Sequence, residues 1–337
     1  MSSSSWSEAA STELKRREED RRSGHKPVEG AYSSLISLKA YVHVEHKQVT
    51  HDGESTHEDR TRTYLEAFKK EIKYYHLPYD KALVNKSVKN YFAASWVREG
   101  YEGRYWVASR GPSERSLYNL LSMLLSDEDR PAEMNNSYPM RTIVQLNGYD
   151  GTADDTVFYL PKEGAKELVK PKRTGTEIYM EVVSQTTMDD MDCIESKVIL
   201  AQGEKKVNIT HLLLNTWKDG EAPDDIKKLI RFIEYVHQIN KGEDGQDVPA
   251  LVHCQAGIGR TGTFIAASSL IRNPCLGSQS TPLSYKSEFE SNTLYEKNYG
   301  RWVYEIDFLR EQRAGMVLSQ KQEEFVASVD EELQKRR

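Results

Sequence analysis

The middle of the chain is dominated by short apolar runs that show the two-residue alternation of β-strands. β-Branched and aromatic residues fill these runs, and Gly, Pro or charged clusters separate them. Such runs between turn signals are typical of strands, because branched and aromatic side chains pack well on a pleated surface. The sequence therefore predicts strands at residues 104–109, 142–146, 156–160, 177–183, 194–200 and 207–214.

Helical periodicity replaces this alternation in the last third of the chain and at one earlier point. Asp224 is a residue type that caps helices, and apolar residues recur at helical spacing after it. The apolar run at 249–252 predicts a buried strand. Further helical patterns occupy residues 64–72, 261–271, 294–310 and 321–333. Strands flanked by helices predict an α/β fold, a twisted mixed β-sheet flanked by helices on both sides.

The first part of the chain differs from the rest. Its opening serines are low-complexity, and residues 39–44 alternate enough for a short strand. Residues 11–22 are densely charged with mixed sign, so we expect a solvated helix or a disordered segment there. We expect an N-terminal extension over residues 1–59, partly disordered or helical, and one catalytic domain over residues 60–337.

Composition narrows the class of protein. The chain has 337 residues, 38% of them hydrophobic, and a formal net charge of -6. A folded core is expected, whereas broad nucleic-acid binding is not, because it needs a basic surface. Three cysteines (Cys193, Cys254 and Cys275) offer no disulfide framework and no paired metal-ligand spacing.

A reducing, cytoplasmic location fits these cysteines. No apolar run approaches the length of a membrane span, and the N-terminus lacks the apolar core of a signal peptide. The oligomeric state is open, and so is delivery through a specialised secretion route.

The most informative stretch is residues 253–262, a Gly-rich loop between the apolar run and a predicted helix. Its N–H groups and the helix dipole converge on one point, which is how proteins bind anions. Cys254 lies at that point, and positive potential favours its thiolate. Arg260 can place two hydrogen bonds on a bound phosphate. The alternative is a buried structural cysteine before a glycine turn.

The Cys-x5-Arg spacing, with its flanking His253, Thr261 and Gly262, resembles the active-site loop of the protein tyrosine phosphatases. Residues 90–95, 105–112, 159–161 and 313–317 resemble further segments of that family in family order, so the resemblance spans about residues 60–335. It implies a phosphatase fold in which Cys254 is the nucleophile. Phosphate is then held by Arg260 and the backbone of Gln255, Ala256, Gly257, Ile258 and Gly259.

Asp219 follows Trp217 and Lys218 on a loop upstream of the cysteine. Cleaving a phosphate ester requires a proton for the leaving oxygen, which an aspartic acid can deliver. The family has Trp-Pro-Asp on such a loop, so the resemblance makes Asp219 the general acid. Lys218 replaces the family proline, which affects loop stiffness. The alternative for Asp219 is an ordinary Asp-Gly turn.

Three positions depart from the family pattern. The family tyrosine that stacks on the substrate ring falls on Lys73, so either Tyr74 or Tyr75 takes this role or the pocket wall differs. Leu318 stands where the family has a glutamine that orients the hydrolytic water. Gln322 aligns with the family's second glutamine, and either Gln320 or Gln322 could compensate, or residues 321–333 form a plain solvated helix.

Asp150 could supply the carboxylate that holds Arg260, although an aspartate beside glycine is more often a turn residue.

Together these features predict hydrolysis of phosphotyrosine in proteins through a phosphocysteine intermediate. Thr261 would hydrogen-bond the cysteine sulfur and help it leave, and His253 would order the loop. No metal or cofactor is required, because the arginine and the amides supply positive charge. Two alternatives stay open. One is a phosphotyrosine-binding protein with weak turnover, and the other is a phosphatase of broader specificity, acting on phosphoserine, phosphothreonine or phosphoinositides.

Overall fold

The computed structural model describes about three fifths of the chain, including both sides of the cysteine loop. The described residues are 3–23, 94–101, 104–114, 116–125, 140–147, 158–171, 175–242, 245, 247–273 and 300–336. The predicted elements at 39–44 and 64–72 lie outside them, as do Tyr75, Asp150 and Cys275.

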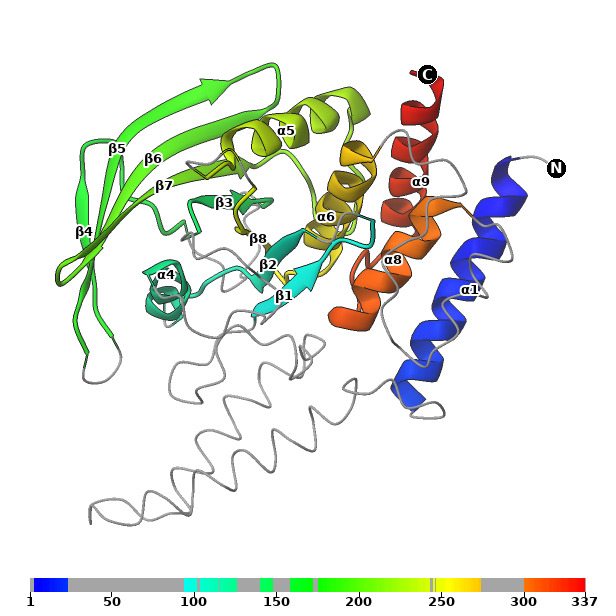
Figure 1. The fold of residues 1–337 in the computed structure, drawn as a ribbon, viewed down its shortest axis with the longest axis horizontal. Helices are drawn as coiled ribbons and strands as arrows, with labels where there is room; N and C mark the ends of the chain where they lie inside the picture. The colour runs from blue at the N-terminus through cyan, green and yellow to red at the C-terminus, as the bar shows by residue number, and fades with distance from the viewer. Residues whose placement is uncertain are drawn as a thin grey trace, which may run out of the picture.

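One eight-stranded sheet organises the fold, in the order β1-β2-β8-β3-β7-β6-β5-β4 (Figure 1). Its strands are β1 Ala94–Arg98, β2 Tyr105–Arg110, β3 Thr142–Gln145, β4 Lys166–Val169, β5 Ile178–Met188, β6 Cys193–Gln202, β7 Lys205–Leu214 and β8 Ala250–Cys254. The centre, from β2 through β8 and β3 to β7, is parallel, and both flanks are antiparallel. The carboxyl ends of the parallel strands therefore meet at one edge, where open α/β sheets usually carry their sites.

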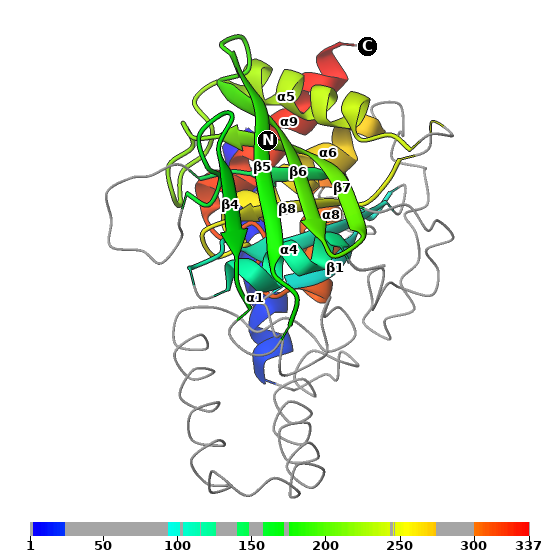
Figure 2. The same ribbon diagram turned by 90° about the vertical axis from the view of Figure 1, so that its left-hand side faces the viewer.

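Helices cover both faces of the sheet. Four helices pack on one face around an apolar core: α5 Ile226–Ile239, α6 Gly259–Arg272, α8 Arg301–Gln312 and α9 Gln320–Lys335. On the other face, α4 Leu117–Leu125 packs with a second core of sheet residues. Figure 2 shows β4, β5, β6 and β7 side by side along their length, with α5 near the top of the view. The predicted mixed α/β fold is confirmed.

Helix α6 is the centre of the larger core, and residues 259–271 are all buried. A side chain at Gly262 would meet the backbone nitrogen of Val317 at 2.4 Å. Glycine thus lets the segment before α9 approach the first turn of α6, and Val317 N donates to Ile258 O at 3.1 Å. The start of α6 and the start of α9 are held together directly behind the cysteine loop.

Most predicted strands and helices are present within a few residues, but some are wrong. Residues 158–160 form no strand, and Phe158 is exposed. Strand β4 and helix α4 were not predicted, since four residues of β4 carry little alternation and α4 is apolar nearly all round. Asp225, not Asp224, caps α5, and its carboxylate accepts from Lys227 N at 2.8 Å.

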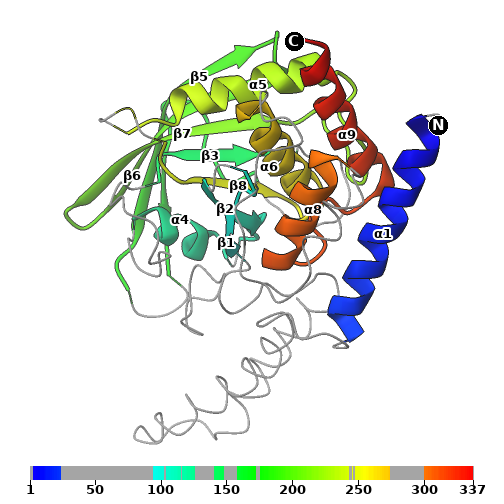
Figure 3. The same cartoon turned by 45° about the vertical axis from the view of Figure 1, so that its right-hand side comes forward.

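Helix α1, Ser3–Ser23, lies against α8 and α9 (Figures 1 and 3). Leu14 is fully buried, and Arg17 is 1% exposed although it carries a charge. Arg17 Nε donates to Asp307 Oδ2 of α8 at 2.9 Å, and Ser11 Oγ donates to Glu323 Oε2 of α9 at 2.6 Å. The expectation of a solvated or disordered segment is wrong for this helix, because partners far along the chain neutralise its buried face.

Candidate active site

Strand β8 delivers Cys254 to the carboxyl edge of the sheet. All of its residues are buried, and it pairs in parallel with β2 on one side and β3 on the other. Cys254 is its last residue and α6 begins at Gly259, so only four residues connect strand and helix. The cysteine is therefore held by a buried strand that is paired on both sides, and it lies just before a helix N-terminus.

The backbone of the loop from Gln255 to Ile258 is held from outside. Gln255 O accepts from Gly111 N at 3.0 Å, and Gly257 O accepts from Arg313 Nε at 2.9 Å. Arg313 Nη2 lies 3.4 Å from Ala256 O. A planar trans peptide points its carbonyl and the following N–H in opposite directions. The N–H groups of residues 256, 257 and 258 therefore turn inward, toward the space above the cysteine.

Gly257 is required by this geometry. Its φ is +70°, in the left-handed region that favours glycine. A side chain there would meet the backbone oxygen of Ser109 on β2 at 2.1 Å. The tight turn that aims the amides therefore depends on glycine at this position.

Two donors converge on the sulfur of Cys254, which is 1% exposed. Gly257 N and Thr261 Oγ1 each lie 3.2 Å from Sγ. Hydrogen-bond donors stabilise negative charge on an acceptor, so this environment suits a thiolate. The predicted contact between Thr261 and the cysteine sulfur is present.

Arg260 lies beside the cysteine, 3% exposed. Its Nη1 donates to Trp217 O at 2.8 Å, and its Nη2 lies 3.0 Å from Asp219 Oδ1. Its Nε is buried and has no partner among the described residues. A buried donor without an acceptor is costly, so this nitrogen fits a site for an anionic oxygen.

The loop of residues 216–221, called the acid loop below, brings Asp219 to the same place. Trp217 anchors it, being 3% exposed and donating from Nε1 to Glu221 O at 2.8 Å. Gly220 has φ +70°, which turns the chain directly after the aspartate. The Asp219 side chain is 61% exposed. The structure thus brings together the three residues, Cys254, Arg260 and Asp219, that the sequence singled out from distant segments.

A buried network of neutral side chains supports the cysteine loop from below. His253 Nδ1 lies 3.3 Å from Cys254 O, and its Nε2 lies 3.0 Å from the hydroxyl of Tyr159. That hydroxyl also lies 3.1 Å from His211 Nε2, which is 3.0 Å from Gln145 Oε1. Burial lowers the pKa of His253 to about 4 and that of His211 to about 3. Both rings are uncharged near neutral pH, which suits the ordering role expected of His253.

His211 was missed by the sequence reasoning. It lies on β7 between Thr210 and Leu212, in a largely apolar stretch where a histidine looks like an ordinary core residue. Its role depends on β7 lying beside β3 and on Tyr159 reaching both histidines, contacts between segments distant in sequence. No local signal could have found it.

Gln322 is 1% exposed, and its amide is engaged on both sides. Its Oε1 accepts from Leu318 N at 3.0 Å and from Ser319 N at 3.3 Å, while its Nε2 donates to Glu221 O at 3.3 Å. The amide of Gln320 donates to Glu324 at 2.9 Å. Leu318 itself is 53% exposed. The two glutamines, either of which could compensate for Leu318, therefore have other partners here.

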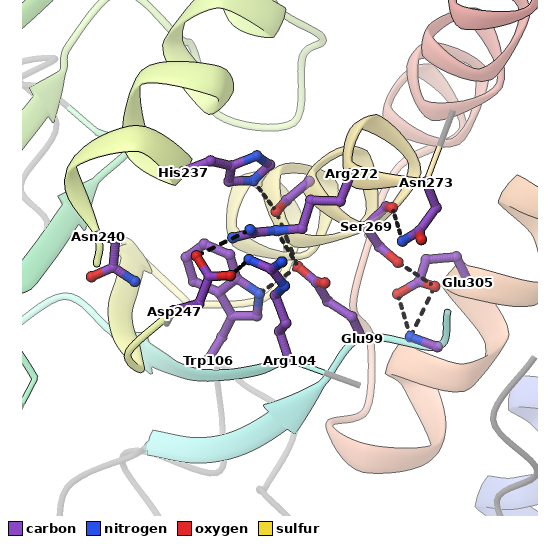
Figure 4. Close-up of polar contacts among 12 residues, drawn as sticks. Glu99, Arg104, Trp106, His237, Asn240, Asp247, Ser269, Arg272, Asn273 and Glu305 are labelled. Atoms are coloured by element: carbon purple, nitrogen blue, oxygen red, sulfur yellow. Dashed lines mark hydrogen bonds and ion pairs between the residues drawn. The ribbon is translucent and has the colours of Figure 1, made fainter. Parts of the chain in front are cut away.

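A second polar cluster lies at the far end of α6, away from the cysteine (Figure 4). Glu305 of α8 accepts from Gly100 N at 3.0 Å and from Ser269 Oγ at 2.9 Å. Burial, with the nearby Glu99 adding to it, raises the pKa of Glu305 to about 8. Trp106 Nε1 and Ser268 Oγ donate to Glu99 at 2.8 and 3.0 Å. This cluster ties the β1–β2 turn to α6 and α8.

Two findings concern other classes of site. Within the described ranges, no group of three or more His, Cys, Asp or Glu side chains could hold a metal ion. In the same part of the chain, no helix is long and apolar enough to cross a bilayer.

Comparison with known proteins agrees with the geometry. The family model described as protein-tyrosine phosphatase matches residues 68–330. The chain therefore belongs to the protein-tyrosine phosphatase family.

Similar proteins carry the same family name. Tyrosine-protein phosphatase 1 of Schizosaccharomyces pombe is 25% identical over 251 residues, covering 73% of this chain and 40% of that protein. Tyrosine-protein phosphatase 69D of Drosophila melanogaster is 38% identical over 204 residues, covering 58% of this chain and 13% of that protein. The chain thus spans less than half the length of either relative.

Among solved structures, the protein tyrosine phosphatase TbPTP1 of Trypanosoma brucei is similar, with a TM-score of 0.57 and 17% identity. The match covers 75% of this chain and 78% of that one. At this identity the likeness concerns the fold.

Proposed function

We propose that this chain hydrolyses phosphotyrosine in proteins through a phosphocysteine intermediate. The observation that carries the proposal is the meeting of three groups. They are a sulfur that accepts two hydrogen bonds, a buried guanidinium whose Nε has no partner among the described residues, and a carboxyl group beside it. A nucleophile, an anion-binding group and an acid are what phosphoryl transfer to cysteine requires.

In the first step, Cys254 Sγ attacks phosphorus opposite the ester oxygen, so that an S–P bond forms as the P–O bond breaks. Arg260 and the inward N–H groups hold the other phosphate oxygens, whose charge must be stabilised in the transition state. Asp219 in its acid form gives its proton to the departing phenolic oxygen, which leaves as tyrosine.

In the second step, Asp219, now a carboxylate, takes a proton from water as the water oxygen attacks phosphorus. The S–P bond breaks, phosphate leaves, and the thiolate is restored. Thr261 Oγ1, 3.2 Å from Sγ, stabilises the sulfur as it departs. No step requires a metal, because Arg260 and the amides provide the positive charge. A thiolate nucleophile also requires a reducing compartment, so we propose a cytoplasmic location.

One observation favours a second function, that of a phosphotyrosine-binding protein with weak turnover. Leu318 cannot hold water by a hydrogen bond, and the amide of Gln322 has other partners. Binding and formation of phosphocysteine would then outpace its hydrolysis.

The test is turnover of a phosphotyrosyl peptide by the wild-type protein and two serine variants. Cys254→Ser should abolish turnover yet still bind the peptide, because a hydroxyl is not ionised at neutral pH. The matched control is Cys193→Ser, since burial raises the pKa of Cys193 to about 12 and its thiol takes no part. Phosphoseryl peptide and phosphoinositide measured in parallel define the specificity. Activity retained by Cys254→Ser, or lost in both variants alike, would contradict the mechanism.

A further inference from the structure

The acid loop is held to the N-terminus of α9 by contacts from three residues, Ser319, Lys321 and Gln322. Ser319 Oγ donates to Gly220 O at 2.8 Å, and Gln322 Nε2 donates to Glu221 O at 3.3 Å. Lys321 Nζ lies 2.8 Å and 2.6 Å from the two carboxylate oxygens of Glu221. These contacts act directly after Asp219, so they bear on where its carboxyl group lies.

The α9 side of this contact is rigid. Ser319 caps α9, and Gln322 closes a capping box by accepting from the Ser319 backbone N–H. Gln322 is also almost fully buried. Because α9 packs on α6, whose N-terminus directly follows the cysteine loop, a contact with α9 places the acid loop relative to Cys254.

The position of Lys321 is unfavourable for the helix alone. It lies in the first turn of α9, where the helix dipole favours carboxylates and disfavours cations. The nearest opposite charge that the structure gives it is Glu221, on the acid loop. Lys321 is therefore placed to attract the loop rather than to stabilise the helix.

We propose that Lys321, through Glu221, is a positioning residue that holds the acid loop closed over Cys254 and Asp219 in place for proton transfer. The inference rests on the proposed function for its effect on catalysis, but not for its effect on the loop. Lys321 touches no reacting atom. The side chains of Lys321 and Glu221 are 63% and 47% exposed, so solvent screens the pair and its contribution is modest.

The sharpest test is a charge swap. Lys321→Glu and Glu221→Lys each replace attraction by repulsion, and the double variant restores attraction with the signs exchanged. Removing an exposed pair changes an equilibrium by about 1.5- to fivefold. We expect amide hydrogen exchange at residues 216–221 to quicken about two- to fivefold in each single variant and to return toward the wild-type rate in the swap. The effect should shrink in 1 M salt, where the screening length falls to about 3 Å.

Turnover provides the second readout. A phosphotyrosyl peptide, whose leaving group needs the acid, should be slowed by each single variant, whereas an activated aryl phosphate should be affected less. Lys162→Glu is the control, since it makes the same charge change at an exposed residue before the edge strand β4. Single variants that match Lys162→Glu in exchange, or a swap that restores nothing, would overturn the inference. If the wild-type protein turned over no phosphate ester, the proposed function would fail, while the exchange result would still decide the role of Lys321.

Discussion

Replacing Arg17 should destabilise the docking of α1 far more than replacing its neighbour Arg16. Arg17 is 1% exposed and hydrogen-bonded to Asp307, which is itself 3% exposed. Its Nη2 also lies 3.9 Å from Glu311. Arg16 carries the same charge on the same helix, but its side chain is 53% exposed, and it pairs with Glu13 of its own helix at 2.8 Å.

The magnitude follows from what Arg17→Met leaves behind. Removing one partner of a buried ion pair costs about 3–5 kcal/mol, because the remaining carboxylates stay buried and lose the charge of Arg17. The free-energy cost of Arg17→Met has an upper limit, because α1 can undock and let water reach Asp307. That limit is the free energy with which α1 docks. The docked helix buries Leu14 completely, which contributes about 1.5–3 kcal/mol, and Ala10 adds less. We therefore expect Arg17→Met to cost about 3 kcal/mol, and Arg16→Met about 0.5 kcal/mol or less.

Two measurements separate local undocking from global unfolding. Urea unfolding reports the free energy of the whole domain, and amide exchange at residues 8–19 reports the docking of α1 alone. Arg17→Met should raise exchange in that segment strongly, even where the urea midpoint moves little. If Arg16→Met and Arg17→Met behave alike in both measurements, the buried ion pair does not hold α1, and the reasoning is refuted.

Three further changes test the site and the second polar cluster. Asp219→Ala should lower turnover of phosphotyrosyl peptide by roughly 10²–10⁴, the usual effect of a general acid, and lower turnover of an activated aryl phosphate much less; equal losses would indicate a structural role. Wild-type enzyme should release a burst of phenol in pre-steady-state assays, and Leu318→Gln should diminish the burst and raise the steady rate. Absence of a burst, with a slower second step in Gln322→Ala, would instead assign the water to Gln322. Glu305 has a folded-state pKa of about 8 against an ordinary 4.5, so its contribution to stability is complete below about pH 4.5 and is lost as pH rises through about 8. Glu305→Gln should remove that loss, on the order of 3 kcal/mol between pH 5 and 8 in urea unfolding, and an unchanged pH profile would contradict the raised pKa.

The parts of the site that the sequence could predict are those made by neighbours in the chain. Strand β8, the glycine loop and the start of α6 are continuous, and the turn requires glycine at Gly257. The central strands were predictable for a similar reason, because burial on one or both faces leaves a local pattern. The local sequence pattern was not enough to predict that Asp219 belongs to the site. Only the family resemblance connected this loop residue with the cysteine at the end of β8.

The parts that could not be predicted depend on partners distant in sequence. The charged residues of α1 were predicted to be solvated, because nothing in the neighbouring sequence indicates that Asp307 neutralises Arg17. His211 read as core because Tyr159 lies 52 positions away. The sequence could align Gln322 with a family glutamine but could not predict its contact with Glu221, by which its amide joins the acid loop to α9 across 101 positions. In each case a polar side chain in an unremarkable position acquires its role only from the packing of separate elements.

The backbone around Leu318 is fixed by its surroundings, so the type of side chain at position 318 matters more than the position of the segment. Val317, the residue before it, has φ +59°, a conformation that a β-branched side chain adopts only under strain of about 1–3 kcal/mol. A protein keeps such a strained conformation only where surrounding contacts hold the backbone in place. Here Val317 N donates to Ile258 O and Val317 O accepts from Arg310, while Arg310 is in turn paired with Glu323.

Both backbone groups of Val317 are therefore fixed, one by the cysteine loop and the other by α8, and Leu318 N is fixed by Gln322. Any residue at position 318 starts from the same backbone, which lies close to Gly259 at the start of α6. We expect the backbone of this segment to accept a glutamine there without rearrangement. A single substitution should thus be enough to change the fate of the phosphocysteine, and a failure of Leu318→Gln to do so would mean that the side chain, rather than the backbone, points elsewhere.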